Sequence, residues 1–188
     1  MYRREWLLVL ASSLTQHRVC DPRRGQSVFA QARADQEDQR YMYRAIELAR
    51  KAPHNPFGAL LVNKAQGRIL AEGWNQATRN PIWHGEIDAI SKCANSDPDV
   101  TWAELTVYTT AEPCAMCQGA ICWAGIRRVV YGASIPFLRS LGWRAIDIRA
   151  QEIARRAAFL TCTIVGGVLE GACNGLFRAA RNTGAPLV

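Results

Sequence analysis

The sequence of 188 residues has no long apolar run, no internal repeat and no low-complexity tract. A membrane-spanning helix needs about eighteen or more consecutive apolar residues, so the sequence predicts no transmembrane span and no membrane partner. The composition is otherwise that of a globular protein, with 49% hydrophobic and 21% charged residues. From the length we expect one domain with a substantial core and no second full domain.

A strong excess of one charge sign is also missing. The net charge is +7, to which residues 1–35 contribute six Arg and three acidic residues, while the rest of the chain carries 17 basic and 13 acidic residues. An excess this mild suits a polyanionic partner, but an ordinary solvated basic surface explains it equally well. The seven cysteines are an odd number, and we interpret them as thiols, mostly buried, of which two bind metal.

Residues 1–35 are interpreted as an N-terminal extension, and residues 36–188 as the folded domain. Arg3-Arg4 precedes a short apolar stretch, and Ala30-Gln31-Ala32 has the small-x-small form of a cleavage site. Residues 1–32 therefore resemble a twin-arginine export signal, which would place the protein in the periplasm. Charged residues after position 16 interrupt the apolar stretch. The alternative is a disordered or weakly helical extension on a cytoplasmic protein.

Hydrophobic periodicity and turn residues predict a helix from about Asp38 to just before Pro53, then an alternation of strands and helices. The expected strands are 57–62, 68–74, 105–110, 128–132 and 162–169, and the expected helices are 84–94, one beginning at Pro113, 146–158 and 170–181. This order predicts an α/β fold, a three-layer α/β/α sandwich around a central five-stranded mixed sheet. The helix at 146–158 is long enough to let the last two strands run parallel.

Two short motifs carry the chemistry. His84-Gly85-Glu86 and Pro113-Cys114-Ala115-Met116-Cys117 each lie where a helix is expected to begin. Cys114 and Cys117 are three residues apart, so both sulfur atoms face one side of a helix. The partial positive charge of a helix N-terminus lowers the pKa of a thiol and so prepares it for a metal ion.

His84, Cys114 and Cys117 supply three ligands, which is the number typical of a catalytic zinc that keeps its fourth position for water or hydroxide. Glu86 stands close enough to act on that water without binding the ion. Each piece alone has a plainer explanation, such as a redox pair, a helix cap or a surface acid. Together, H-x-E followed by P-C-x-x-C is the signature of zinc deaminases, with one Zn²⁺ per chain.

From about residue 38 to 181 the chain resembles the guanine deaminase, cytosine deaminase and tRNA adenosine deaminase branch of the cytidine-deaminase superfamily. The resemblance implies a cytidine deaminase-like fold and hydrolytic removal of ammonia from an aminated nucleobase or nucleoside. Glu86 would carry the proton from water to the ring nitrogen and then to the leaving ammonia. The zinc deaminase domain is then residues 36–188.

The resemblance also implies substrate contacts. Asn55-Pro56-Phe57-Gly58-Ala59 is closest to guanine-deaminase-like enzymes, in which it lines the base pocket, and Asn75 resembles the Asn that touches substrate. Gly85 stands where most relatives have Ala, is similar to fungal cytosine deaminases, and leaves the backbone N–H open to a ring. Core packing is the alternative role for Phe57 and, preferably, for Trp74. We therefore expect a small-molecule substrate, guanine-like by preference, with cytosine as another candidate.

Two further functions stay open at this stage. One is conversion of adenosine-34 of tRNA to inosine, with residues 177–181 contacting phosphate or simply ending a helix. The other is a non-catalytic, zinc-stabilised interaction protein with the deaminase fold. The relatives are usually dimers, so we expect a homodimer in which Trp123, Ile126 and Phe137 either form the contact or belong to the core.

Overall fold

The computed structural model describes residues 22–183, with side chains from residue 36 onward. Five strands form one sheet in the order β2-β1-β3-β4-β5. The strands are β1 Gly58–Asn63, β2 Arg68–Trp74, β3 Leu105–Ala111, β4 Arg128–Ala133 and β5 Thr163–Val165. The helices are α1 Pro22–Ala49, α2 Gly85–Ser96, α3 Ala115–Trp123, α4 Ile135–Ser140, α5 Ala150–Arg156 and α6 Glu170–Asn182, with a 3₁₀ turn at Trp102–Glu104.

The sheet is mixed, as predicted. β1 pairs antiparallel with both β2 and β3, whereas β3, β4 and β5 run parallel to one another. A parallel pair needs a crossover connection, and α3 and α5 lie in the two crossovers, between β3 and β4 and between β4 and β5. The expected parallel arrangement of the last two strands is confirmed.

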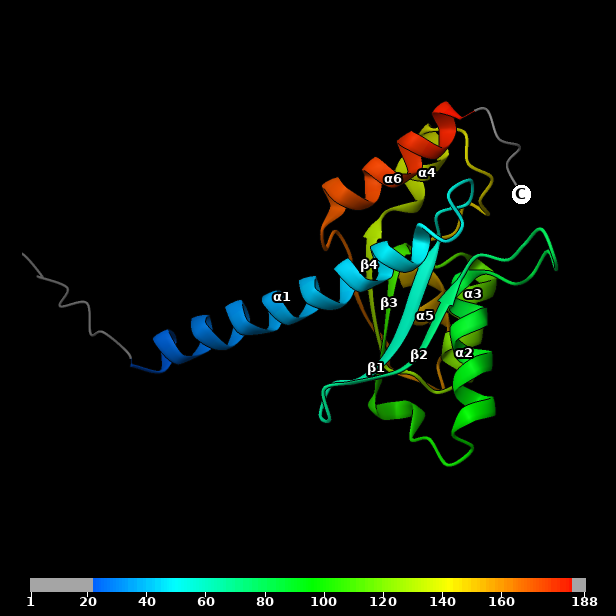
Figure 1. Ribbon diagram of the computed structural model, residues 1–188. Coiled ribbons are helices and arrows are strands. Elements are labelled where there is room, and N and C mark those ends of the chain that lie inside the picture. Colours follow the sequence, from blue (N-terminus) through cyan, green and yellow to red (C-terminus); the bar gives the residue numbers. More distant parts are fainter. Residues whose placement is uncertain (1–21, 184–188) are drawn as a thin grey trace, which may run out of the picture.

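Helices cover both faces of the sheet, which confirms the three-layer architecture (Figure 1). On one face α1 and α6 enclose a cluster that includes Met42, Leu60 and Phe177. On the other face α2, α3 and α5 enclose a cluster that includes Leu61 and Ile121. Neighbouring strand residues point to opposite faces. Because both faces are covered, β1 and β3 are buried along their whole length, and β1 reads as a nearly continuous apolar run.

Helix α1 begins at Pro22, earlier than the expected start near Asp38. Residues 30–32, the proposed cleavage site, lie inside this helix. The Arg3-Arg4 motif lies outside the described residues, so an export signal stays a prediction. None of the described helices is both long and apolar enough to cross a bilayer.

The elements after β4 differ most from the prediction. Helix α4 was not expected, although Ser134 caps it by accepting a hydrogen bond from the Phe137 N–H and Pro136 lies in its first turn. The predicted helix at 146–158 shortens to α5 because residues before Arg149 form a loop. The predicted strand at 162–169 shortens to β5 because Gly167 adopts a positive φ of 81°.

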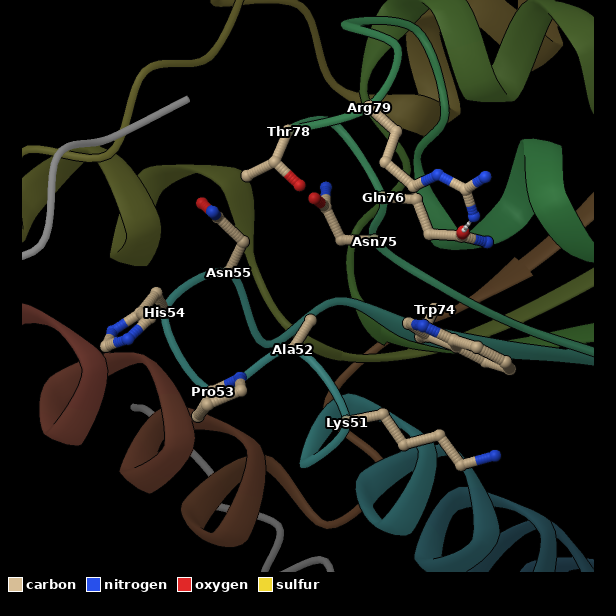
Figure 2. A pocket seen from close by; sticks show the side chains of 10 residues that line it. All are labelled: Lys51, Ala52, Pro53, His54, Asn55, Trp74, Asn75, Gln76, Thr78 and Arg79. Atoms are coloured by element: carbon tan, nitrogen blue, oxygen red, sulfur yellow. Dashed lines mark hydrogen bonds between the residues drawn. The ribbon is translucent and has the colours of Figure 1, made fainter.

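A cavity of about 300 Å³ lies where the loop after α1 faces the loop after β2 (Figure 2). Its lining includes Asn55 from the first loop and Asn75 and Thr78 from the second. Both loops continue directly from elements that pack against the sheet, so the fold places this cavity at one end of β1 and β2.

Candidate active site

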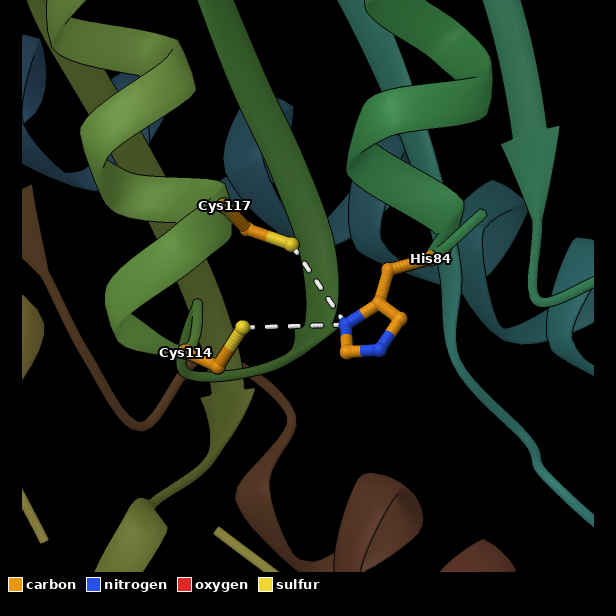
Figure 3. A group of neighbouring side chains, drawn as sticks. All are labelled: His84, Cys114 and Cys117. Atoms are coloured by element: carbon orange, nitrogen blue, oxygen red, sulfur yellow. Dashed lines mark hydrogen bonds between the residues drawn. The ribbon is translucent and has the colours of Figure 1, made fainter. Parts of the chain in front are cut away.

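The three predicted metal ligands meet at the starts of two helices. His84 is the N-cap residue of α2, Cys114 is the N-cap residue of α3, and Cys117 lies in the first turn of α3. Pro113 therefore precedes the helix by two residues and does not open it, which corrects the predicted start. Figure 3 shows both sulfur atoms turned toward the His84 ring.

The distances fit a tetrahedral zinc ion. His84 Nδ1 lies 3.6 Å from Cys114 Sγ and 3.5 Å from Cys117 Sγ. All three ligand atoms lie within 4.8 Å of one another. Zinc bonds of about 2.3 Å to sulfur and 2.0–2.1 Å to nitrogen, at tetrahedral angles, place the two atoms about 3.6 Å apart. The side chains are therefore arranged for this ion, and they supply three ligands and leave the fourth position open.

The titration of these side chains also suits a cation. A hydrogen bond from Cys117, together with the nearby His84 ring, lowers the pKa of Cys114 to about 4. The same contact, with burial, raises the pKa of Cys117. The hydrogen bond to Cys114 raises the pKa of His84. A thiolate thus attracts protons on both neighbours, and a bound divalent cation would replace those protons.

Glu86 lies beside the metal ligands in a buried position, 4% exposed. Thr109 of β3 donates a hydrogen bond of 2.9 Å to Glu86 Oε1. Burial, and then the Cys114 thiolate, raise the pKa of Glu86, so this carboxyl is suited to holding a proton. Thr109 was not predicted from the sequence, because nothing in a strand rich in β-branched residues distinguishes the one that faces the site.

Glu112 fixes the segment between β3 and α3, which leads into Cys114. Its carboxylate accepts hydrogen bonds from the Ile135 N–H at the start of α4 and from the Ala150 N–H at the start of α5. Arg149 adds a charged hydrogen bond of 2.7 Å. Glu112 thereby ties two helix N-termini to the strand end that leads into Cys114. The sequence motifs alone predicted no role for Glu112 or Arg149, because their partners lie far away in the chain.

Phe57 and Gly85 lie next to the metal ligands. The Phe57 ring stacks beside the His84 ring with a centroid distance of 6.5 Å, and it also packs edge-on against Trp143. At Gly85 an added Cβ would lie 2.8 Å from the Phe57 carbonyl oxygen. Close packing against Phe57 therefore favours glycine at this position, in addition to the proposed exposure of its N–H. That both residues touch substrate stays a prediction.

Asn75 lines the cavity of Figure 2. Its backbone N–H donates to the Phe57 carbonyl, and its side-chain Oδ1 accepts from the Ala77 N–H. A second cavity, of about 510 Å³, is lined by His84 and Cys114 among others. The metal ligands thus face a space large enough for a heterocyclic ring.

The surface predictions have mixed outcomes. Ile126 is fully buried and belongs to the core, while Phe137 is half-buried and Trp123 is 80% exposed. In α6, Phe177 is fully buried. Arg181 donates to the Leu141 carbonyl, and Arg178 lies over the Phe137 ring. Both arginines contact the chain's own fold, as expected for an ordinary terminal helix.

Residues 35–133, which contain all three metal ligands and Glu86, match the family described as the cytidine and deoxycytidylate deaminase zinc-binding region. The chain is 41% identical over 149 residues to a tRNA-specific adenosine deaminase of Haemophilus influenzae, covering 73% of this chain and 79% of the relative. It is 33% identical over 102 residues to a probable cytosine deaminase of Schizosaccharomyces pombe, covering 53% and 62%.

The fold is similar to a solved structure of guanine deaminase from Nitrosomonas europaea. The TM-score is 0.65 at 25% sequence identity, and the alignment covers 75% of this chain and 82% of that one. These three proteins are named for three different aminated bases: adenosine in tRNA, cytosine and guanine.

Proposed function

Because the chain belongs to the cytidine and deoxycytidylate deaminase family and is a zinc-dependent hydrolytic deaminase, we propose that it acts on a small aminated nucleobase or nucleoside, guanine-like by preference. The observation that carries the proposal is the placement of Glu86, which is buried and accepts a hydrogen bond from Thr109, beside the three-ligand set. A structural zinc site would have no use for that carboxyl, and it usually has four protein ligands.

His84, Cys114 and Cys117 would hold the zinc ion, which polarises water and makes it a nucleophile at neutral pH. Glu86 would accept one proton of the attacking water and pass it to the ring nitrogen. It would then take the remaining proton of the added hydroxyl group and deliver it to the leaving amine, as the C–N bond breaks and the carbonyl forms. Thr109 fixes one carboxylate oxygen of Glu86, so the other stays available for transfer. Burial keeps bulk water from competing for the proton.

Two features support the guanine-like preference. The segment Asn55-Pro56-Phe57-Gly58-Ala59 matches guanine-deaminase-like enzymes in kind, and Phe57 offers an aromatic face beside His84. A flat aminated ring gains from stacking on such a face. The solved guanine deaminase of similar fold agrees with this choice.

A tRNA adenosine deaminase is the second candidate, favoured by the identity of 41% to the Haemophilus influenzae enzyme. Such an enzyme needs positive side chains that are free to contact phosphate. Arg178 and Arg181 are instead engaged with Phe137 and with the Leu141 carbonyl. This engagement is why we place the small-molecule substrate first.

The test measures ammonia release by the zinc-loaded chain offered guanine, cytosine, adenine, their ribonucleosides and an adenosine-34 tRNA. We expect turnover of a free base or nucleoside, with the tRNA untouched. Turnover of tRNA alone would establish the second candidate and overturn the first. The Glu86→Gln variant, loaded with zinc, is the control, and its rate of ammonia release should be lower by about 10²–10⁴-fold.

We also propose that the chain forms a homodimer through the surface around Trp123. Trp123 and Phe159 stack at a centroid distance of 4.9 Å, and both are largely exposed, at 80% and 61%. Exposed aromatic pairs of this kind are enriched at protein interfaces. Light scattering after gel filtration should give twice the chain mass, and Trp123→Glu should give a monomer.

A further inference from the structure

The cavity of Figure 2 holds a buried polar group that the fold does not use. Asn55 is only 6% exposed, and its side-chain Oδ1 has no hydrogen-bond partner among the described residues. The backbone of Asn55 already makes the turn, because its N–H donates to Ala52 and its carbonyl accepts from Phe57. The side chain is therefore not needed for the local fold, and leaving it unpaired costs free energy.

Asn55 shares the lining of the cavity with two other polar side chains, Asn75 and Thr78, whose polar ends lie next to each other (Figure 2). Asn75 uses its oxygen to accept from the Ala77 N–H, which leaves its amide NH₂ for a ligand. Thr78 is exposed, and its hydroxyl both donates and accepts. The cavity thus presents neutral donors and acceptors together, the combination that recognises hydroxyl groups.

The two cations at the rim are engaged elsewhere. The Lys51 ammonium lies 4.3 Å from the centre of the Trp74 ring. The Arg79 guanidinium lies over Trp83 and donates to Gln76. A phosphate site would need such groups turned inward. The cavity is therefore suited to an uncharged polyol and not to a phosphate.

The position of the cavity connects it to the metal ligands. Asn75 lines the cavity and bonds through its backbone to Phe57, whose ring lies beside that of His84. A ring lying by Phe57 and His84 would therefore be close to Asn75, whose side chain lines the cavity. A volume of about 300 Å³ is at the low end for small-molecule sites and suits one sugar ring.

We propose that this cavity is a sugar-binding subsite in which Asn55, Asn75 and Thr78 recognise ribose hydroxyls, so that the preferred substrate is a nucleoside and not a free base. The inference rests on the proposed function. It assigns Asn55 and Thr78 a role in specificity that the metal motifs do not supply.

The experiment measures binding, not turnover, in the zinc-loaded Glu86→Gln chain by titration calorimetry. The ligands are three pairs: guanosine and guanine, cytidine and cytosine, adenosine and adenine. We expect the nucleoside of at least one pair to bind about tenfold more tightly than its base, as one or two net hydrogen bonds would give. Asn55→Ala should abolish that difference while leaving the affinity for the base unchanged.

Two variants make the result decisive. Asn174→Ala is the matched control, because Asn174 in α6 is also buried with an unpaired Oδ1 but does not line the cavity. It should leave the preference intact. Thr78→Val replaces an exposed side chain with one of the same shape and should weaken nucleoside binding even if Asn55→Ala fails to fold.

Equal affinity or no binding in all three pairs would overturn the inference. So would a nucleoside preference that survives both cavity variants. Failure of the proposed function is seen separately, as the absence of ammonia from every base and nucleoside offered to the unsubstituted chain.

Discussion

Two buried carboxyl groups, Asp38 and Glu86, contact adjacent residues of β3 on opposite faces of the sheet. Tyr108 donates to Asp38 Oδ1 at 2.6 Å on the α1 face, and Thr109 donates to Glu86 Oε1 at 2.9 Å on the α2 face. Both carboxyl groups are at least 95% buried, with 3% and 4% exposed. The strand therefore presents one acid to each layer of the sandwich.

The two acids differ in the partners that the chain provides. Burial opposes ionisation of Asp38, but hydrogen bonds from Arg128 and Tyr108, with Lys64 nearby, outweigh it and lower the pKa. Among the described residues no Lys or Arg pairs with Glu86, and burial raises its pKa. A carboxylate neutralised by the chain's own cations stabilises the fold. A carboxylate such as Glu86, which has no such cation within the described part of the chain and lies beside the metal ligands, remains available for proton transfer.

The largest expected effect concerns the metal set beside Glu86. Cys114→Ala should reduce bound zinc from about one ion per chain to near zero, because two remaining ligands hold the ion weakly. Activity should be lost with it. Metal analysis by mass spectrometry checks this, with Cys93→Ala as the control for a buried thiol that lies in the α2 core. Full zinc content in the Cys114 variant would remove Cys114 from the ligand set.

Glu86→Gln should lower kcat by about 10²–10⁴-fold, the range for one general acid–base group. Zinc content should be unchanged, and the free energy of unfolding should stay equal or rise, because a buried carboxyl with a raised pKa is replaced by a neutral amide. Steady-state kinetics and chemical denaturation check both parts. A large loss of stability would mean that Glu86 resembles Asp38 after all.

Asp38→Asn should show the opposite pattern, with kcat per folded molecule unchanged and stability lowered by about 1.5–3 kcal/mol at pH 7. The lowered pKa means that Asp38 contributes stability above the pKa of the unfolded chain and loses it as the pH falls through the folded value. The variant should therefore unfold with a weaker dependence on pH below about pH 5. Denaturation midpoints at several pH values measure this, and an unchanged dependence would contradict the assignment.

The smallest effects come from the two β3 donors. Thr109→Val should lower kcat about fivefold to tenfold with little change in KM, because one oxygen of Glu86 loses its positioning hydrogen bond. Tyr108→Phe should leave kcat unchanged and cost about 1 kcal/mol of stability. Comparable losses of kcat in both variants would show that the two faces do not act separately.

The metal site could be predicted from the sequence because its residues form two groups, each within a few positions of the chain. His84 and Glu86 are two positions apart, Cys114 and Cys117 three, and each pair needs only the start of a helix to present its side chains. The five strands were also predictable, since buried β-branched runs leave a strong pattern. The segments after β4 were less so, because single residues such as Ser134 and Gly167 set their boundaries.

Other parts depend on residues far apart in the chain. Glu112 meets Ala150 and Arg149 only after β4 and α4 have been placed between them. Asn55 faces Thr78 only because the antiparallel pairing of β1 with β2 brings both loops to one end of the sheet. No local pattern distinguishes such residues from ordinary loop residues.

The sequence by itself determined the zinc motif, the three side chains that group around it and the alternation of helices and strands, because these depend on spacings within one turn and on apolar periodicity. The role of Glu86 as proton carrier stays a prediction. The tertiary structure decided which acid is neutralised and which is not, through the opposite faces of β3. It also decided which polar side chains share a cavity beside the site. The burial of each acid and the charge of its partners arise only when helices pack on both faces of the sheet. The same packing brings the loops that line the cavity together.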